Sequence, residues 1–343
     1  MLKRKVARLA GPRKFEIAEE KIKPPGAKEL LIRIVSAGLC HTEVAAYLGK
    51  SAIAVSKDGK YFKNDKLKYP LELGHEGVGI VEEVGKDVKE FKQGEWVGGV
   101  IKSSFASYVT VDVTKRSLAK IPDGISDRKY CLVEPLMCVT NIVRAAAPRF
   151  GDYVAVIGCG AMGLLCLSAL AKSAAFEIVA LDLVDFRLRM AEKLGATKTI
   201  NPGKVKTEKV VEQLTDGRGM DVVIEISGRM SGFSLACDII RGGWSPESAG
   251  GRGKILIPSL YAFPEVMDAG YQLMFKSPII HSTHPWYSMN YREDMTRGIE
   301  GYSKGIFPLK QLVTHEFSLE NIEDGFEMMV EPEENYIKGI VVP

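Results

Sequence analysis

The chain contains 343 residues, a length that suits about two domains, and its apolar fraction of 46% is ordinary for a soluble globular protein. A net charge of +3 predicts that the protein has no nucleic-acid or acidic-lipid partner. No apolar run reaches the ~18 residues of a membrane span, so none is expected. The basic start is not followed by an apolar segment, so we expect no signal peptide. The six cysteines are scattered without a C-x-x-C pair, which predicts a reduced, cytoplasmic protein without disulfides.

Residues 1–120 are predicted to form short strands, because their apolar residues run or alternate between turn signals such as Gly85 and Gly94. The glycine-rich stretch 74–85 predicts bulges or a close approach of two backbones within a strand. Residues 49–70 are polar and rich in lysine, and we expect them to form a surface loop. The strands expected in this part are Leu30–Ser36, Gly77–Val84, Glu95–Val100 and Ser107–Val113.

From Val133 onward the apolar period becomes helical, and strands then alternate with helices. This alternation is typical of a parallel, doubly wound sheet with helices on both faces. We expect Arg241–Gly253 to form a long loop and the tail after about Thr283 to close back onto the first domain. The expected strands are Tyr153–Ile157, Ile178–Leu181, Val222–Ile226, Lys254–Pro258, Pro278–Ser282 and Ile337–Val342, and the expected helices include Asp185–Leu194, Lys206–Leu214, Arg292–Lys304 and Leu319–Met329.

A G-x-G-x-x-G motif, formed by Gly158, Gly160 and Gly163, follows directly on an apolar strand. It opens a helical pattern from Ala161 to about Ser173, and this context supports a dinucleotide site. The first glycine permits a tight turn, the second lets the backbone approach a pyrophosphate, and the third lets helix and strand pack closely. The phosphates would bind the free N–H groups at the helix N-terminus.

An acidic residue decides which dinucleotide is predicted. Asp182 ends the second strand, nineteen residues after Gly163, where a carboxylate hydrogen-bonds the ribose hydroxyls of NAD and repels the extra phosphate of NADP. The alternative is a glycine-rich turn with a chance aspartate, and Cys159 within the turn is interpreted as a small packing residue. The residues expected to bind NAD are Gly158, Gly160, Ala161, Met162, Gly163, Asp182 and Arg187.

A second set, Cys40, His75, Glu76 and Glu134, carries side chains with metal-ligand chemistry. Thiolate, imidazole and carboxylate all bind zinc, and a catalytic zinc keeps one position open for water or substrate. These residues lie far apart in the sequence, so their spacing alone does not establish a site. The alternatives are a buried small residue for Cys40, a hydrogen-bonded core histidine for His75 and a helix cap for Glu134.

In combination, these motifs resemble the zinc-dependent medium-chain dehydrogenases, such as alcohol, sorbitol and threonine dehydrogenases, over nearly the whole chain. The resemblance implies an α/β chain with a GroES-like, β-rich catalytic domain (residues 1–136 and 284–343) and a Rossmann NAD-binding domain (residues 137–283). The matching segments are Ala37–Glu43 (AGLCHTE), Gly74–Gly79 (GHEGVG), Gly94–Val97 (GEWV), Glu134-Pro135 and the GCGAMG turn followed by Asp182.

The resemblance also implies a set of metal ligands. Cys40 and His75 match zinc ligands, Glu76 matches a carboxylate that binds zinc in some members, and Glu134 matches the third protein-ligand position. A glutamate at position 134 favours sugar or polyol substrates. Most relatives carry a second, structural zinc on four cysteines, but residues 98–107 contain none, so we expect one catalytic zinc and no structural zinc.

By the same resemblance, Thr42 passes on the substrate proton, and Glu43 holds the other nitrogen of His75 and fixes its tautomer. Ala45 stands where many relatives have a histidine that relays the proton to solvent, so the proton is expected to leave by another route. Seven further side chains have two possible roles, contact with substrate or cofactor, or packing at a surface or interface. They are His41, Tyr261, Phe263, His281, His284, Trp286 and Tyr287.

The implied activity is zinc- and NAD-dependent oxidation of a secondary alcohol, namely a polyol, sugar or cyclitol derivative, to the ketone by hydride transfer. The partner is a small-molecule alcohol, and the assembly is a homodimer or homotetramer. The alternatives are amino-alcohol oxidation, as in threonine dehydrogenases, a zinc-free quinone-reductase-like activity, and a non-catalytic NAD(H)-binding sensor on the same scaffold.

Overall fold

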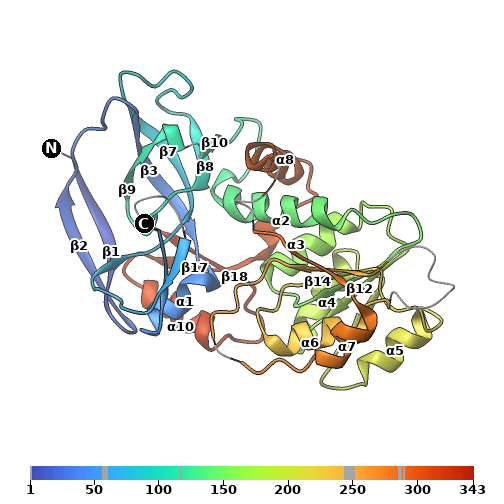
Figure 1. Ribbon diagram of the computed structural model, residues 1–343. Helices are drawn as coiled ribbons and strands as arrows, with labels where there is room; N and C mark the ends of the chain where they lie inside the picture. The colour runs from blue at the N-terminus through green and yellow to red at the C-terminus, as the bar shows by residue number, and fades with distance from the viewer. Residues whose placement is uncertain are drawn as a thin grey trace. The chain divides into compact units, whose positions relative to one another are not determined.

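The computed structural model describes residues 2–55, 61–115, 118–242, 252–263, 265–284, 288 and 290–343 (Figure 1). The chain divides into two compact units. The first unit consists of Met1–Leu136, Met295–Ser303 and Leu309–Pro343, and the second of Met137–Asp294 and Lys304–Pro308.

The second boundary lies later than the sequence-based boundary at residue 284. Residues 293 and 294 contact the second unit through Arg144, whose guanidinium forms ion pairs with Glu293 (3.3 Å) and Asp294 (2.6 Å). Asp294 is only 1% exposed, whereas the Arg144 side chain is 42% exposed, so the pair lies at the edge of the buried interior.

Antiparallel strands dominate the first unit. Its largest sheet has the order β10-β8-β7-β3-β18-β17, with β9 also paired to β3. The carboxyl-terminal strand β18 therefore lies in one sheet with strands from the first third of the chain, which confirms the prediction for the tail. The bounds are β1 Lys3–Gly11, β2 Lys14–Lys21, β3 Glu29–Gly38, β6 Leu71–Glu72, β7 Glu76–Val84, β8 Trp96–Val100, β9 Tyr108–Asp112, β10 Leu118–Lys120, β17 Val313–Ser318 and β18 Lys338–Val342.

The pairing of β3 with β7 explains both the apolar run and the glycine-rich stretch of the sequence. Leu30 and Ile32 on β3 are fully buried in a core shared with Val81 and Val97. At Gly79 an added Cβ would lie 2.4 Å from the carbonyl oxygen of Arg33, so only glycine fits there. The pairing also contains two register shifts, and the predicted bulges and close backbone approach are thus confirmed.

The lysine-rich segment 49–70 is not simply a loop. β4 (Ala52–Val55) pairs antiparallel with β5 (Tyr61–Asn64), so the prediction of a loop was wrong for these two runs. Each run carries β-branched or aromatic residues that favour strands, which the abundance of lysine around them obscured. Residues 56–60 lie outside the described part of the chain.

The second unit contains one parallel sheet with the strand order β13-β12-β11-β14-β15-β16. Its order reverses between β11 and β14, and ligands of doubly wound sheets bind beyond the carboxyl ends of the strands at this reversal. The bounds are β11 Tyr153–Ile157, β12 Glu177–Leu181, β13 Lys198–Ile200, β14 Val222–Glu225, β15 Lys254–Ile257, β16 Ile279–Ser282, α3 Ala161–Leu170, α4 Asp185–Lys193, α5 Thr207–Leu214, α6 Met230–Ile239 and α7 Gly270–Lys276.

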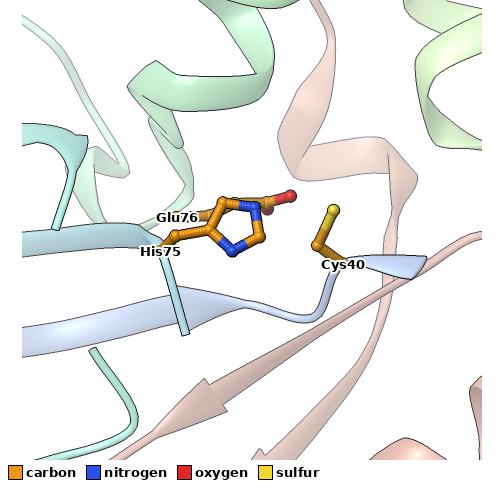
Figure 2. Close-up of side chains that lie close together, drawn as sticks. All are labelled: Cys40, His75 and Glu76. Atoms are coloured by element: carbon orange, nitrogen blue, oxygen red, sulfur yellow. The ribbon is translucent and has the colours of Figure 1, made fainter. Parts of the chain in front are cut away.

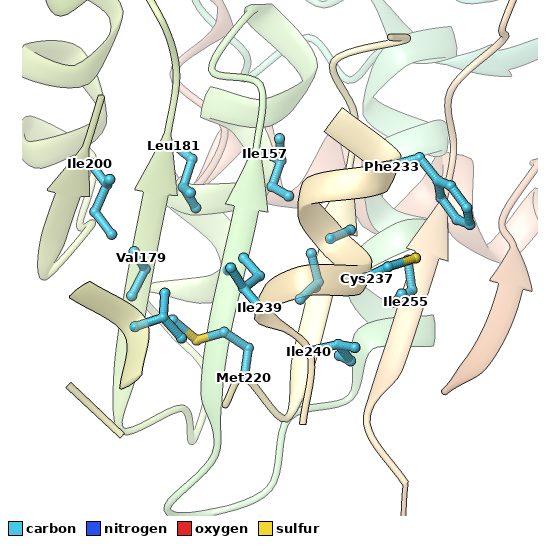
Figure 3. Close-up of a cluster of buried hydrophobic side chains, with 14 of the residues drawn as sticks. Ile157, Val179, Leu181, Ile200, Met220, Phe233, Cys237, Ile239, Ile240 and Ile255 are labelled. Atoms are coloured by element: carbon cyan, nitrogen blue, oxygen red, sulfur yellow. The ribbon is translucent and has the colours of Figure 1, made fainter. Parts of the chain in front are cut away.

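The predicted strands of this unit are confirmed, with small shifts at their ends. β15 ends before Pro258 and β16 begins after Pro278, because proline cannot donate a hydrogen bond to a neighbouring strand. One core cluster fills the space between this sheet and α6, as Figure 3 shows for residues such as Ile157, Val179 and Ile255. The loop predicted over Arg241–Gly253 falls mostly on residues 243–251, which lie outside the described chain.

The remaining helices are short. Among the described helices, none is long and apolar enough to cross a membrane, and α2, with 14 residues, falls well below the ~20 that a spanning helix needs. Their bounds are η1 His41–Glu43, η2 Val113–Lys115, η3 Arg128–Tyr130, α1 Val44–Tyr47, α2 Val133–Ala146, α8 Tyr291–Ser303, α9 Leu309–Leu312 and α10 Ile322–Val330.

Candidate functional site

The pairing of β3 with β7 brings Cys40, His75 and Glu76 together in the first unit. Cys40 follows β3 and precedes η1, while His75 directly precedes β7 and Glu76 is its first residue. Gly38, near the end of β3, lies opposite Glu76 in the sheet register. An added Cβ at Gly38 would come within 1.9 Å of the Glu76 Oε2 atom, so the glycine makes room for this carboxylate.

The Cys40 sulfur, a ring nitrogen of His75 and a carboxylate oxygen of Glu76 all lie within 4.8 Å of one another (Figure 2). Glu76 is buried, whereas Cys40 and His75 are partly exposed. Among the described residues, these three form the group of histidine, cysteine and acidic side chains whose spacing could hold a metal ion.

Two neighbouring side chains orient these groups. The Glu43 Oε1 atom lies 3.1 Å from His75 Nδ1 and accepts a hydrogen bond of 2.6 Å from the backbone N–H of Gly74. The Thr42 hydroxyl donates to the Cys40 sulfur at 3.3 Å. Glu43 thus leaves the Nε2 atom of His75 as the nitrogen available to a ligand.

Negative charge determines the electrostatics of this group. Burial by itself lowers the pKa of His75, but the carboxylate of Glu43 and the sulfur of Cys40 together raise that pKa well above its ordinary value of 6.5. The surroundings therefore favour a positive charge on or beside the imidazole ring. A soft sulfur, an imidazole and a carboxylate in such surroundings fit a zinc ion, which would take the place of the proton.

Lys338 is a charged residue at the site that the sequence did not reveal. It lies on β18, is 7% exposed, and places its ammonium group 2.6 Å from Glu76 Oε2. It also donates to the backbone oxygen of Leu39 at 2.8 Å. Burial lowers the pKa of Lys338. The negative charges of Glu76 and then Cys40 raise this pKa by more, so the net shift is upward. The available signal was a lysine directly before the apolar run Gly339–Val342 of a strand.

Glu134 is not part of the group of three within 4.8 Å. It lies in the first turn of α2, is half-buried, and belongs to the same unit as Cys40 and His75. Burial raises the pKa of the Cys131 and Cys166 thiols to about 12 and keeps both protonated.

The glycine turn of the second unit has the form expected for a dinucleotide site. Gly158 has a φ of +99°, and an added Cβ there would lie 2.8 Å from the backbone of Ser227. An added Cβ at Gly163 would lie 1.9 Å from the carbonyl oxygen of Gly158, so helix α3 packs directly on the turn. At Gly160 an added Cβ would meet nothing within 4 Å. This open space beside the first residues of α3, Ala161 and Met162, suits a pyrophosphate.

Asp182 follows β12 and faces this turn. Its Oδ2 atom accepts the backbone N–H of Cys159 at 2.7 Å, and its Oδ1 atom accepts that of Val184 at 2.8 Å. Burial and then the carboxylate of Asp182 raise the pKa of the Cys159 thiol, and the guanidinium of Arg187, in the first turn of α4, lowers it by less. Both predicted cofactor contacts, Asp182 and Arg187, therefore lie beside the glycine turn.

The other residues that the sequence suggested for substrate or cofactor contact differ in their surroundings. His41, His281 and His284 are exposed, and Ala45 is buried. Tyr261 donates its hydroxyl to Glu225 at 2.5 Å, a contact within the second unit. Phe263 is half-buried, and Trp286 and Tyr287 lie outside the described residues.

Comparison with known proteins agrees with both halves of this description. Residues 26–123 match the family described as Alcohol dehydrogenase GroES-like domain, and residues 161–243 match the family described as Zinc-binding dehydrogenase. The L-threonine 3-dehydrogenase of Bacillus subtilis is 30% identical over 329 residues, with 88% of each chain covered.

Solved structures show the same architecture. The 2R,3R-butanediol dehydrogenase of Bacillus subtilis has a TM-score of 0.79 and 25% identity, with 99% of each chain covered. A zinc-binding dehydrogenase of Sinorhizobium meliloti, solved with NADP, has a TM-score of 0.79 and 21% identity over 100% of each chain. The fold class predicted from the sequence, a GroES-like domain with a Rossmann domain, is confirmed. The chain is an oxidoreductase of the alcohol dehydrogenase type, with zinc and a nicotinamide dinucleotide as cofactors, and it belongs to the family of zinc-binding medium-chain dehydrogenases.

Proposed function

We propose that the protein oxidises a small secondary alcohol to the ketone with NAD as the hydride acceptor. The observation that carries the proposal is the group formed by Cys40, His75 and Glu76, with the Thr42 hydroxyl 3.3 Å from the Cys40 sulfur. This group combines metal donors with a hydroxyl that can move a proton, which alcohol oxidation requires.

We assign the metal-binding role to Cys40, His75 and Glu134, with Glu76 as a further carboxylate beside them. One zinc per chain would supply a Lewis acid that lowers the pKa of the alcohol. Glu43 fixes the tautomer of His75 through its Nδ1 atom at 3.1 Å. Thr42 would accept the proton of the substrate hydroxyl at its Oγ1 atom while it passes its own proton on through the cofactor ribose hydroxyls and water.

We assign the cofactor-binding role to the turn from Gly158 to Gly163, Asp182 and Arg187. The N–H groups at the start of α3 would bind the pyrophosphate, and Asp182 would accept hydrogen bonds from the ribose hydroxyls. A carboxylate that is already held by two backbone N–H groups repels a 2′-phosphate, so NAD is favoured over NADP.

Two substrate classes follow from different observations. Glu134 in place of a cysteine supports a polyol, sugar or cyclitol derivative, which was the class expected from the sequence. The threonine 3-dehydrogenase relatives support an amino alcohol instead. Threonine at its 3-position and 2,3-butanediol both carry the hydroxyl on a secondary carbon, which is the feature common to the two classes.

A substrate panel tests the proposal. Polyols, inositols, 2,3-butanediol and L-threonine are each assayed with NAD and with NADP, and zinc is quantified on the same sample. We expect turnover of a secondary alcohol, a higher kcat/KM with NAD than with NADP, and about one zinc per chain. Turnover confined to L-threonine would select the amino-alcohol class. NADH binding without turnover of any alcohol would contradict the proposal and support the sensor alternative.

We further propose that two copies of the chain associate through the edge strand β16. All four of its residues are exposed, and among the described strands it pairs only with β15. Exposed edges with apolar side chains favour pairing with another strand, and two identical edges pair around a twofold axis. The β16 edge patch consists of the four exposed residues of this strand, Ile279 (46% exposed), Ile280 (47%), His281 and Ser282.

The substitution Ile280→Asp is expected to convert the dimer to a monomer, because it places a charge in the middle of the β16 edge patch. Light scattering coupled to gel filtration measures the mass in solution. Val205→Asp is the control, since Val205 is equally exposed (47%) and lies before α5, outside the patch. A dimer that survives Ile280→Asp, or that Val205→Asp disrupts equally, would contradict this assignment.

A further inference from the structure

Glu225, the last residue of β14, carries a carboxylate that the proposed chemistry does not use. It is 0% exposed, and it lies opposite Ile157, the last residue of β11, in the sheet register. The two strands flank the point where the strand order reverses. A buried carboxylate is costly unless hydrogen bonds satisfy its oxygens, so its position there requires a physical reason.

Hydrogen-bond donors surround this carboxylate. The Oε1 atom accepts the backbone N–H of Ser227 at 2.9 Å and also the Ser227 hydroxyl. The Oε2 atom accepts the hydroxyl of Tyr261 at 2.5 Å. Burial and the contact with Glu225 raise the pKa of Tyr261, so the phenol keeps its proton and acts as the donor. A carboxylate, with acceptor capacity on both oxygens, fits this arrangement better than an amide.

The same contacts hold the turn that follows β14. The Ser259 hydroxyl donates to the backbone oxygen of Glu225 at 3.0 Å and accepts the N–H of Gly228 at 3.2 Å. On the opposite side, Gly232 of α6 leaves the space that Glu225 occupies, because an added Cβ there would lie 2.6 Å from Oε1. Ser227 and Gly228 are therefore tied to Glu225 by side-chain and backbone contacts.

The turn formed by residues 226–228 packs directly against the glycine turn that is proposed to bind the cofactor. An added Cβ at Gly158 would lie 2.8 Å from both the Cα and the N atom of Ser227, and one at Gly163 would lie 3.3 Å from the Ile226 side chain. The N–H of Ile226 donates to the backbone oxygen of Ile157 at 2.9 Å. A shift of the Ser227 backbone would therefore change the packing against Gly158 directly.

We propose that Glu225 is a positioning residue for the dinucleotide, acting through Ser227 and Tyr261 to hold the turn 226–228 against Gly158. With this turn held in place, the cofactor meets a site that is already formed and orders less of the chain on binding. Glu225 itself is fully buried and does not touch the cofactor. The inference rests on the proposed binding of NAD at the Gly158 turn.

Titration with NADH, followed by quenching of protein fluorescence, tests the inference without turnover or metal. We expect Glu225→Gln to raise the Kd for NADH by about tenfold, the equivalent of one hydrogen bond to a charged group. Tyr261→Phe, which removes one donor and keeps the ring, is expected to raise the Kd in the same direction and by less. It also serves as the test if Glu225→Gln does not fold.

Asp221→Asn is the matched control. Asp221 is also a buried carboxylate (9% exposed), but it precedes β14 at the other end of the strand, where it pairs with Arg241 at 2.7 Å and accepts the N–H of Tyr153 at 2.9 Å. We expect it to lower the Tm and leave the Kd for NADH unchanged. An unchanged Kd in Tyr261→Phe and in any folded Glu225→Gln protein, or an equal rise in Asp221→Asn, would overturn the inference. If the unsubstituted protein binds no NADH, the proposed function fails instead.

Discussion

Replacement of Cys40 by alanine is expected to remove the bound zinc and to lower turnover by at least about a thousandfold, because Lewis-acid stabilisation supplies several kcal/mol of the catalytic effect. The substitution deletes the sulfur that lies within 4.8 Å of the His75 and Glu76 donor atoms, together with the acceptor for the Thr42 hydroxyl. NADH binding is expected to survive, since the glycine turn and Asp182 belong to the other compact unit. Metal analysis, NADH titration and steady-state kinetics on one preparation measure all three effects.

Cys237→Ala is the control for this experiment. Cys237 lies in α6 within the core of the second unit, burial raises the pKa of its thiol to about 11, and it is not part of the group formed by Cys40, His75 and Glu76. The control protein is expected to retain zinc and turnover. Retained turnover in a zinc-free Cys40→Ala protein would contradict the metal role of Cys40.

Replacement of Lys338 by methionine is expected to destabilise the first unit by about 3–5 kcal/mol, the usual effect of removing one partner of a buried ion pair. The ammonium group lies 2.6 Å from Glu76 Oε2, and the two side chains are 9% and 2% exposed. Without Lys338, the Glu76 carboxylate would remain buried beside the Cys40 sulfur and would lack its partner at 2.6 Å. Urea unfolding in the presence of a chelator measures the loss as a lower transition midpoint.

The double variant Lys338→Met with Glu76→Gln separates charge from packing. Neutralising Glu76 removes the uncompensated charge, so the double variant is expected to recover most of the lost stability, and the coupling between the two positions follows from the full cycle of four proteins. Lys120→Met is the surface control, because Lys120 pairs with Glu95 at 2.7 Å while its side chain remains 46% exposed. That substitution is expected to change stability by less than about 1 kcal/mol. Equal effects of Lys338→Met and Lys120→Met would show that the Glu76 pair is not buried in solution.

Local sequence patterns predicted the parallel sheet and the conformation of its glycine turn well. A G-x-G-x-x-G motif between an apolar strand and a helix depends on steric demands within a few residues, and the contacts of Gly158 and Gly163 show those demands directly. The strands with long apolar runs were also found, since burial on both faces leaves a continuous apolar signal. The short strands β4 and β5 were missed, because four residues among lysines carry little of that signal.

The buried charges were not visible in the sequence. Lys338 was not recognised, because its partners Glu76 and Leu39 are brought next to it only when β18 joins the sheet of β3, and Leu39 lies 299 residues away in the chain. The sequence placed Glu225 within a strand and indicated no function for it. For Tyr261, which donates a hydrogen bond to Glu225, the sequence did not distinguish substrate contact from packing. Whether such a side chain is exposed or buried depends on the neighbours that long-range pairing supplies.

For this protein, the sequence by itself determined the glycine turn after β11 and the alternation of strands and helices, because both depend on contacts between residues close in the chain. The motifs around Cys40 and His75 suggested a metal site only through their resemblance to a family. The tertiary structure decided which donors meet: it brought Cys40, His75 and Glu76 within 4.8 Å and left Glu134 outside that group. It also decided that Lys338 and Glu225 are buried, because only the pairing of distant strands removes a charged side chain from water and supplies the partner that makes this burial tolerable.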